Sequence, residues 1–187
     1  MITTYHRPKT LDEALTFLSQ PNTVPLGGGT LLSHPSPDPV SVVDLQALGL
    51  DSLRVKGNDL EIGATVTLQQ LLESEHYPAA LKTALKLEAP INLRNAATVA
   101  GAVVTVDGRS TFACSLLALD AKIEQAIFDN SKIEYRVSNI GDYFPLRLTK
   151  LNLADWDSFE KTLTAIKNAE PEIEGVKVYP ISAGACG

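Results

Sequence analysis

The chain has 187 residues, 44% hydrophobic and 20% charged, a composition ordinary for a globular protein long enough to bury a substantial core. Its formal net charge of −6 excludes the concentrated basic surface that nucleic-acid binding needs, so we expect no nucleic-acid partner. No apolar run approaches the roughly 20 residues that cross a bilayer, and no signal peptide is visible, so we expect a cytoplasmic protein without a membrane span.

The first fifty residues predict a small α/β lobe. An amphipathic stripe predicts a helix over 11–18, and Thr10 and Glu13 have the spacing of a capping box at its start. Residues 23–26 predict a short strand that runs into a glycine segment, and residues 40–45 predict a second, buried strand. Strands combined with a helix in this way favour an α/β arrangement.

Residues 51–187 predict a larger lobe that mixes helices and strands. Residues 53–55 and 60–62 alternate in polarity around a Gly-Asn-Asp turn, which is typical of a hairpin. The remaining predicted elements are helices over 77–89 and 112–119, strands over 122–127 and 133–137, and a final helix marked by Trp156, Phe159, Leu163 and Ile166. The secondary structure of residues 98–106 is not decided by the sequence, because their valines favour a strand while their small residues allow a tight turn.

Residues 27 to 30, Gly-Gly-Gly-Thr, form the first motif that suggests a ligand. Consecutive glycines bring bare main chain close to a ligand, and converging N–H groups beside a threonine hydroxyl suit phosphate oxygens. The motif lacks the lysine of a P-loop and the spacing of a dinucleotide-binding Rossmann fingerprint. A plain glycine-rich turn between a strand and a helix is the alternative.

A second run, Ala89 to Gly101, offers Asn92, Arg94, Asn95 and Thr98 ahead of several small residues. Such small residues permit close packing against a ligand. By itself the run favours a loop that is tied down by its own asparagine and arginine hydrogen bonds.

Taken together, several motifs in one order resemble the FAD-binding domain of molybdopterin dehydrogenases, the flavin component of xanthine dehydrogenase and carbon monoxide dehydrogenase type enzymes. The resemblance covers roughly residues 1–150. The matching segments are Tyr5-His6-Arg7-Pro8, Gly28-Gly29-Thr30, Ile62 to Thr67, Arg94 to Gly101, Ser115 to Ala121, and Asp142-Tyr143-Phe144.

The resemblance implies an α+β, two-lobed fold of the PCMH type, shared with vanillyl-alcohol-oxidase-like proteins. A small α/β lobe would span residues 1–50, and a larger lobe with an antiparallel sheet would span 51–187, with FAD between them. The family's usual C-terminal flavoprotein domain is not expected within the chain, because the match ends near residue 150.

The resemblance also implies which residues hold FAD. One segment would wrap the pyrophosphate, a second would line the other side of the cofactor, and a threonine stands where the family has a carboxylate. These residues are Pro25, Leu26, Gly27, Gly28, Gly29, Thr30, Leu31, Leu32, Thr98, Val99, Ala100, Gly101, Ala102 and Thr111.

The sequence departs from the family pattern at three of these positions. Ala100 replaces a glycine, Ala102 replaces an asparagine, and Thr111 replaces an aspartate. Ala100 adds a side-chain carbon, Ala102 removes an amide and Thr111 removes a carboxylate, so we expect an affinity for FAD that is lower than the family's by roughly one to three orders of magnitude.

Two functions follow as hypotheses. In the first, the chain is the FAD-binding subunit of a molybdenum-hydroxylase-type oxidoreductase, with molybdenum-cofactor and [2Fe–2S] subunits as partners and NAD⁺ or another acceptor. In the second, it is a truncated, non-catalytic relative that binds nucleotide weakly or serves in assembly. No catalytic acid, base, nucleophile or metal site is expected, since the chain has two distant cysteines and its histidines show no triad or ligand spacing. Cys114 is expected to be a small buried hydrophobe.

Overall fold

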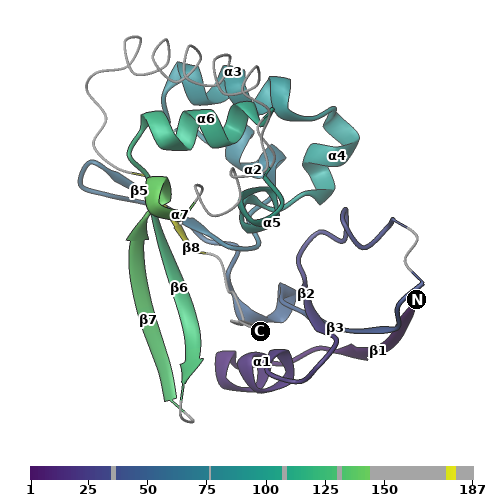
Figure 1. Ribbon diagram of the computed structural model, residues 1–187. Coiled ribbons are helices and arrows are strands. Elements are labelled where there is room, and N and C mark those ends of the chain that lie inside the picture. The colour runs from purple at the N-terminus through teal and green to yellow at the C-terminus, as the bar shows by residue number, and fades with distance from the viewer. Residues whose placement is uncertain (35–36, 76, 107–108, 130–131, 144–175, 180–187) are drawn as a thin grey trace.

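The computed structural model describes all residues except 35–36, 76, 107–108, 130–131, 144–175 and 180–187. Its elements form two sheets, each with its own helices (Figure 1). The helix predicted around Trp156 lies outside the described residues.

The smaller sheet is parallel, with the order β1-β3-β2. Its strands are β1 (Ile2–His6), β2 (Thr23–Leu26) and β3 (Val40–Asp44). Helix α1 (Leu11–Leu18) joins β1 to β2, and the 3₁₀ helix η1 (Gln46–Leu48) follows β3. Since the strands run in one direction, their carboxyl ends meet at one edge, and the glycine segment leaves β2 from that edge.

The larger sheet has the order β4-β5-β8-β6-β7. Its strands are β4 (Leu53–Lys56), β5 (Asp59–Gly63), β6 (Lys122–Asp129), β7 (Lys132–Asn139) and β8 (Val176–Tyr179). Two antiparallel hairpins, β4–β5 and β6–β7, are joined by β8, which runs parallel to both β5 and β6. The antiparallel sheet expected for this lobe is therefore a mixed one.

Helices cover one face of the larger sheet (Figure 1). They are α2 (Leu68–Glu73), α3 (Ala79–Glu88), α4 (Ile91–Ala96), α5 (Val99–Val104) and α6 (Thr111–Ala118), with the short α7 (Ile140–Tyr143) after β7. Side chains of α2, α3, α5 and α6 pack with those of β5 and β6 in the main core. Fully buried members include Ile62, Leu81, Phe112 and Ile123.

A second core joins the smaller sheet to the far face of the larger one. Ala14, Leu15 and Val43 pack there with Ala126 of β6, and Ile133 of β7 lies against them. Side chains alternate between the faces of a strand, so Ile123 and Ala126 belong to opposite faces of β6. The β6–β7 hairpin is consequently the element shared by both halves of the fold.

Several predicted elements are confirmed, and others are corrected. Confirmed are α1, β2, β3, the β4–β5 hairpin, α3, α6 and the two strands of the β6–β7 hairpin. Residues 98–106 were open between strand and turn, but they contain helix α5. Thr98 begins this helix, because its Oγ1 accepts a hydrogen bond from the amide of Gly101.

The capping box predicted at α1 is only half formed. Thr10 Oγ1 accepts from the amide of Glu13 at 3.3 Å, as expected. The carboxylate of Glu13 instead accepts from the amide of Lys9 at 3.0 Å. A second capping box, Thr67 with Gln70, is complete at the start of α2.

Candidate functional site

The glycine segment after β2 packs directly against the turn between α4 and α5. A Cβ added to Gly28 would lie 1.5 Å from the carbonyl oxygen of Ala96, and one added to Gly27 would lie 2.7 Å from Thr98 Oγ1. Glycine is thus required at position 28 by contact with main chain. The two motif segments touch across the two halves of the fold, as the flavin hypothesis requires.

Residues 28–32 present unused main-chain donors. Within the part of the chain that the structure describes, none of the amides from Gly28 to Leu32 donates a hydrogen bond. Gly29 has a φ of +72°, a conformation that glycine adopts without strain. A run of unpaired amides beside a left-handed residue is suited to an anion.

The loop is held from the carboxyl edge of the smaller sheet. Gln46 Nε2 donates to the carbonyl of Gly27 at 3.3 Å, and the amide of Gln46 donates to Asp44 Oδ1 at 2.9 Å. The hydroxyl of Tyr5 donates to the other carboxylate oxygen of Asp44, and Arg7 Nε lies 3.6 Å from it. The Tyr-x-Arg motif therefore acts here as an anchor of β1 and β3 near the loop.

The amides of residues 99–102 all donate hydrogen bonds within the protein. The amide of Val99 donates to Val66 O, that of Ala100 to Ala64 O, and that of Ala102 to Thr98 O, at 2.8, 3.3 and 2.9 Å. Gly101 N is used by Thr98 Oγ1. The sequence suggested bare main-chain donors on both segments, but the structure already uses those of residues 99–102, while those of residues 28–32 stay unpaired.

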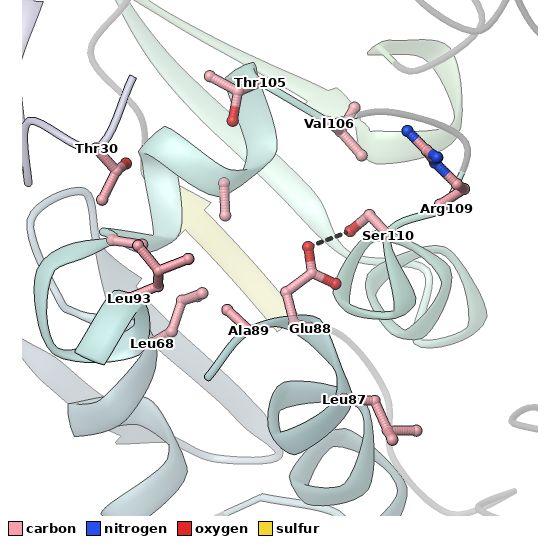
Figure 2. Close-up of a pocket in the computed structure, with 12 residues that line it drawn as sticks. Thr30, Leu68, Leu87, Glu88, Ala89, Leu93, Thr105, Val106, Arg109 and Ser110 are labelled. Atoms are coloured by element: carbon pink, nitrogen blue, oxygen red, sulfur yellow. Dashed lines mark hydrogen bonds between the residues drawn. The ribbon is translucent and has the colours of Figure 1, made fainter. Parts of the chain in front are cut away.

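A cavity with a volume of about 390 Å³ lies beside the loop (Figure 2). This falls in the range usual for small-molecule sites. Its apolar walls come from α2, α3, α4 and α5, and its polar groups are Thr30, Glu88, Thr105, Arg109 and Ser110. Figure 2 shows Thr30 across the cavity from Glu88 and Ser110. The complete lining set is Thr30, Leu68, Leu87, Glu88, Ala89, Leu93, Ala97, Ala102, Thr105, Val106, Arg109 and Ser110.

Glu88, at the end of α3, is fixed by the first turn of α6. Its Oε1 accepts from Ser110 Oγ at 2.9 Å, and its Oε2 accepts from the amide of Phe112 at 2.9 Å. Thr111 Oγ1 lies 3.1 Å from Oε2 and 2.8 Å from the carbonyl of Ala84. The carboxylate thereby occupies the positive end of α6, where negative charge is stabilised.

Arg94, in the second motif, holds the helices behind the cavity together. Its Nε donates to Gln69 Oε1 of α2 at 2.9 Å, and one guanidinium nitrogen donates to Ala89 O at 2.5 Å and Lys86 O at 3.4 Å. For residues 89–101 the sequence also allowed a loop tied down by its own hydrogen bonds. Arg94 does make such bonds, but the segment is not a loop, because it contains α4 and the start of α5.

The predicted site residues therefore separate into groups. Thr30 and Ala102 line the cavity, Gly27 and Gly28 join the two motif segments, and Pro25 and Leu26 belong to β2. Thr111 is bonded toward α3 and is not among the lining residues. Four polar lining residues were not predicted from the sequence, because packing of α3 against α6 brings Glu88 and Ser110 together and no local spacing indicates this. The other two are Thr105, at the end of α5, and Arg109, just before α6.

Cys114 and His6 are the cysteine and histidine of the described residues whose surroundings the structure defines most clearly. Cys114 is 4% exposed, and burial, with a smaller effect of the Glu88 charge, raises the pKa of its thiol to about 11. It is a buried hydrophobe, as expected. His6 stacks on Phe17. Among the described residues there is no group of acidic, histidine or cysteine side chains that could hold a metal, and no helix long and apolar enough to span a membrane.

Comparisons with known proteins agree with this arrangement. The family model described as the FAD binding domain in molybdopterin dehydrogenase matches residues 1–152. YgfM, an uncharacterised protein of Escherichia coli K12, is 32% identical over 136 residues, which are 71% of this chain and 51% of YgfM.

Solved structures show the same fold. A chain of Cu,Mo-CO dehydrogenase superposes with a TM-score of 0.63 at 26% identity, covering 75% of this chain and 51% of that one. A chain of reconstituted CO dehydrogenase from Oligotropha carboxidovorans gives 0.62 at 26% identity, covering 73% and 50%. Quinoline 2-oxidoreductase from Pseudomonas putida 86 gives 0.63 at 21% identity, covering 75% and 51%, and supports the fold alone. The chain spans about half the length of these relatives.

Proposed function

Because the chain belongs to the family of FAD-binding domains in molybdopterin dehydrogenases, we propose that it holds FAD with the diphosphate on residues 28–32. The observation that carries this proposal is the run of unpaired amides from Gly28 to Leu32 beside the 390 Å³ cavity. Main-chain N–H groups pair with phosphate oxygens without needing a cationic side chain. Thr30 adds a hydroxyl on the cavity wall.

The chain's own residues bind and orient the cofactor, while FAD supplies the redox chemistry when it is bound. Ala97 and Ala102 give the cavity small side chains against which the cofactor packs. In this role the chain is the flavin component of a molybdenum-hydroxylase-type oxidoreductase, carrying electrons between a [2Fe–2S] subunit and NAD⁺ or another acceptor. The likeness to a chain of a Cu,Mo-CO dehydrogenase supports a molybdenum-cofactor partner.

Titration with FAD tests the binding step. The purified protein should retain the visible absorption of flavin, and FAD at 100 times its Kd should stabilise the fold by about 2.7 kcal/mol. Leu31→Pro removes one loop amide and should weaken FAD binding by roughly tenfold, since a hydrogen bond to a charged group contributes about 1.5–3 kcal/mol. Leu31→Ala is the matched control, because Leu31 is exposed and its side chain is not needed. Absent absorption and an unchanged melting temperature would refute the proposal.

The electron-transfer role needs a separate measurement. Bleaching of the bound flavin by NADH would support NAD⁺ as the acceptor. Co-purification of the chain with molybdenum-containing and [2Fe–2S]-containing proteins would support the assembly.

One observation favours the second candidate, a non-catalytic relative that binds nucleotide weakly or serves in assembly. The amides of residues 99–102 are already bonded within the protein, and Thr111 is bonded to α3, so residues 28–32 are left to provide the main-chain donors. This candidate predicts a Kd for FAD near the millimolar range and a colourless purified protein. The titration above separates the two.

A further inference from the structure

We propose that Glu88 accepts hydrogen bonds from the ribose hydroxyls of the adenosine half of the ligand, so that the cavity selects a ribose without a phosphate. This inference rests on the proposed function, since it assumes that the ligand's diphosphate lies on residues 28–32. Glu88 is the only carboxylate among the described residues that line the cavity.

The two sides of the cavity offer opposite hydrogen-bonding groups. On the side of residues 28–32 the groups available are donors, the unpaired amides. Across from Thr30 they are mainly acceptors (Figure 2). Ser110 donates its hydroxyl hydrogen to Glu88 at 2.9 Å and accepts from the amide of Ala113 at 3.0 Å, while Thr105 donates its own hydrogen to Gly101 O at 2.8 Å. Both hydroxyl hydrogens are therefore used within the protein, and each oxygen could only accept from a ligand.

Glu88 keeps capacity for a further bond. Its Oε2 accepts from the Phe112 amide and lies 3.1 Å from Thr111 Oγ1, whose single hydrogen is shared with Ala84 O, whereas its Oε1 accepts from Ser110 alone. A carboxylate oxygen has two lone-pair sites, so Oε1 can accept a hydroxyl from a ligand. The bonds from α6 hold the carboxylate in one orientation and thus prepare it for that contact.

The same carboxylate opposes an anion on its side of the cavity. By occupying the amino end of α6, Glu88 fills the place where a phosphate would otherwise find amides and a favourable dipole. A phosphate would meet a like charge there, while a diol would meet an acceptor. The ligand therefore enters with its diphosphate toward Thr30 and its ribose toward Glu88.

Arg109, in contrast to Glu88, would favour a ribose that carries a phosphate. It also lines the cavity, and an arginine can receive a ribose phosphate. In Figure 2 its side chain extends toward Val106 rather than toward Glu88. The competing influence of Arg109 can be tested directly with a phosphorylated ligand.

The test compares ADP, 2′,3′-dideoxy-ADP and ADP carrying a 2′-phosphate by calorimetric titration of the full chain. The wild type should bind dideoxy-ADP roughly tenfold or more weakly than ADP, the range expected for a charge-assisted hydrogen bond. It should also bind the 2′-phosphorylated ligand more weakly than ADP. In Glu88→Gln both differences should shrink to about twofold, because an amide group would face the ligand.

Glu134→Gln, an exposed change on β7, is the matched control and should leave all three affinities unchanged. Equal binding of ADP and dideoxy-ADP by the wild type would overturn the inference, as would tighter binding of the 2′-phosphorylated ligand. Both results come from the wild type, so they stand even if Glu88→Gln folds poorly. Binding of FAD with no diol preference would overturn the role of Glu88 alone. If neither FAD nor ADP binds, the proposed function fails together with the inference about Glu88.

Discussion

At residue 28 a main-chain carbonyl occupies the space where any other amino acid would place its first side-chain carbon. The 1.5 Å separation between that position and Ala96 O cannot be relieved by rotating a side chain. Gly29 differs, because a Cβ there would meet only Leu26 Cδ1 at 3.4 Å and its requirement comes from a positive φ. The first two glycines of the motif are thus needed for packing, and the third for conformation.

We expect Gly28→Ala to separate the loop from the α4–α5 turn. The free energy of unfolding should fall by about 2 kcal/mol or more, which is typical of overpacking against a rigid neighbour, and FAD binding should weaken by more than tenfold. Urea unfolding and FAD titration measure the two effects.

Gly141→Ala is the control, since a Cβ there meets only Leu117 Cδ2 at 3.9 Å. An alanine at position 28 that left both quantities unchanged would show that the loop does not need its contact with Ala96.

The elements that the sequence predicted well are mainly those whose apolar residues recur at a regular spacing. Helices α1 and α3 and the β4–β5 hairpin show apolar spacing that matches one buried face, whereas α6 is an apolar segment with five consecutive buried residues. Strand β1 was missed because four of its five residues are exposed and show no alternation. Helix α2 was also missed, although the Thr67–Gln70 capping box was readable in the sequence.

Other features depend on contacts between distant segments and had no local signal. The valines of α5 suggested a strand, but its short turn forms around the cap at Thr98. The two glycine-containing segments were rightly expected to meet. Their unequal donors could not be predicted, because Val66 and Ala64, far from Thr98 in the sequence, accept the bonds that saturate α5. Glu88 reaches the cavity only through the packing of α3 on α6.

Among the helices, we expect Arg94→Ala to loosen α4 from α2 and α3. The change removes bonds to Gln69 and to two carbonyls at the end of α3, and it should lower the free energy of unfolding by about 1–3 kcal/mol. Arg136→Ala, at an exposed position of β7, should change it by less than about 0.5 kcal/mol. Chemical denaturation of both variants measures the difference, and equal values would show that Arg94 adds nothing to helix packing.

Across the whole molecule, the two sheets are joined by a shared apolar cluster. Ala126 of β6 is 5% exposed and packs with Leu15 and Val43 of the smaller half. The division into lobes near residue 50 remains our proposal. The shared cluster indicates that the two lobes depend on each other for stability.

We therefore expect a single cooperative unfolding transition, with fluorescence and far-ultraviolet circular dichroism giving the same midpoint. Ala126→Asp places an unpaired charge in the cluster and should destabilise both sheets together, by about 3 kcal/mol or more. Gln125→Asp, on the neighbouring and less buried position, should cost much less. Two separate transitions in the wild type would show that the lobes fold independently.

Recognition through peptide groups has a consequence for altering this protein. The amides from Gly28 to Leu32 stay in place when most side chains around them are exchanged, so side-chain substitutions would hardly change which anion the loop binds. Redesign toward another cofactor would have to begin on the facing wall. On that wall the ligand selectivity depends on side chains such as Glu88 and Ser110, so a single substitution can change it.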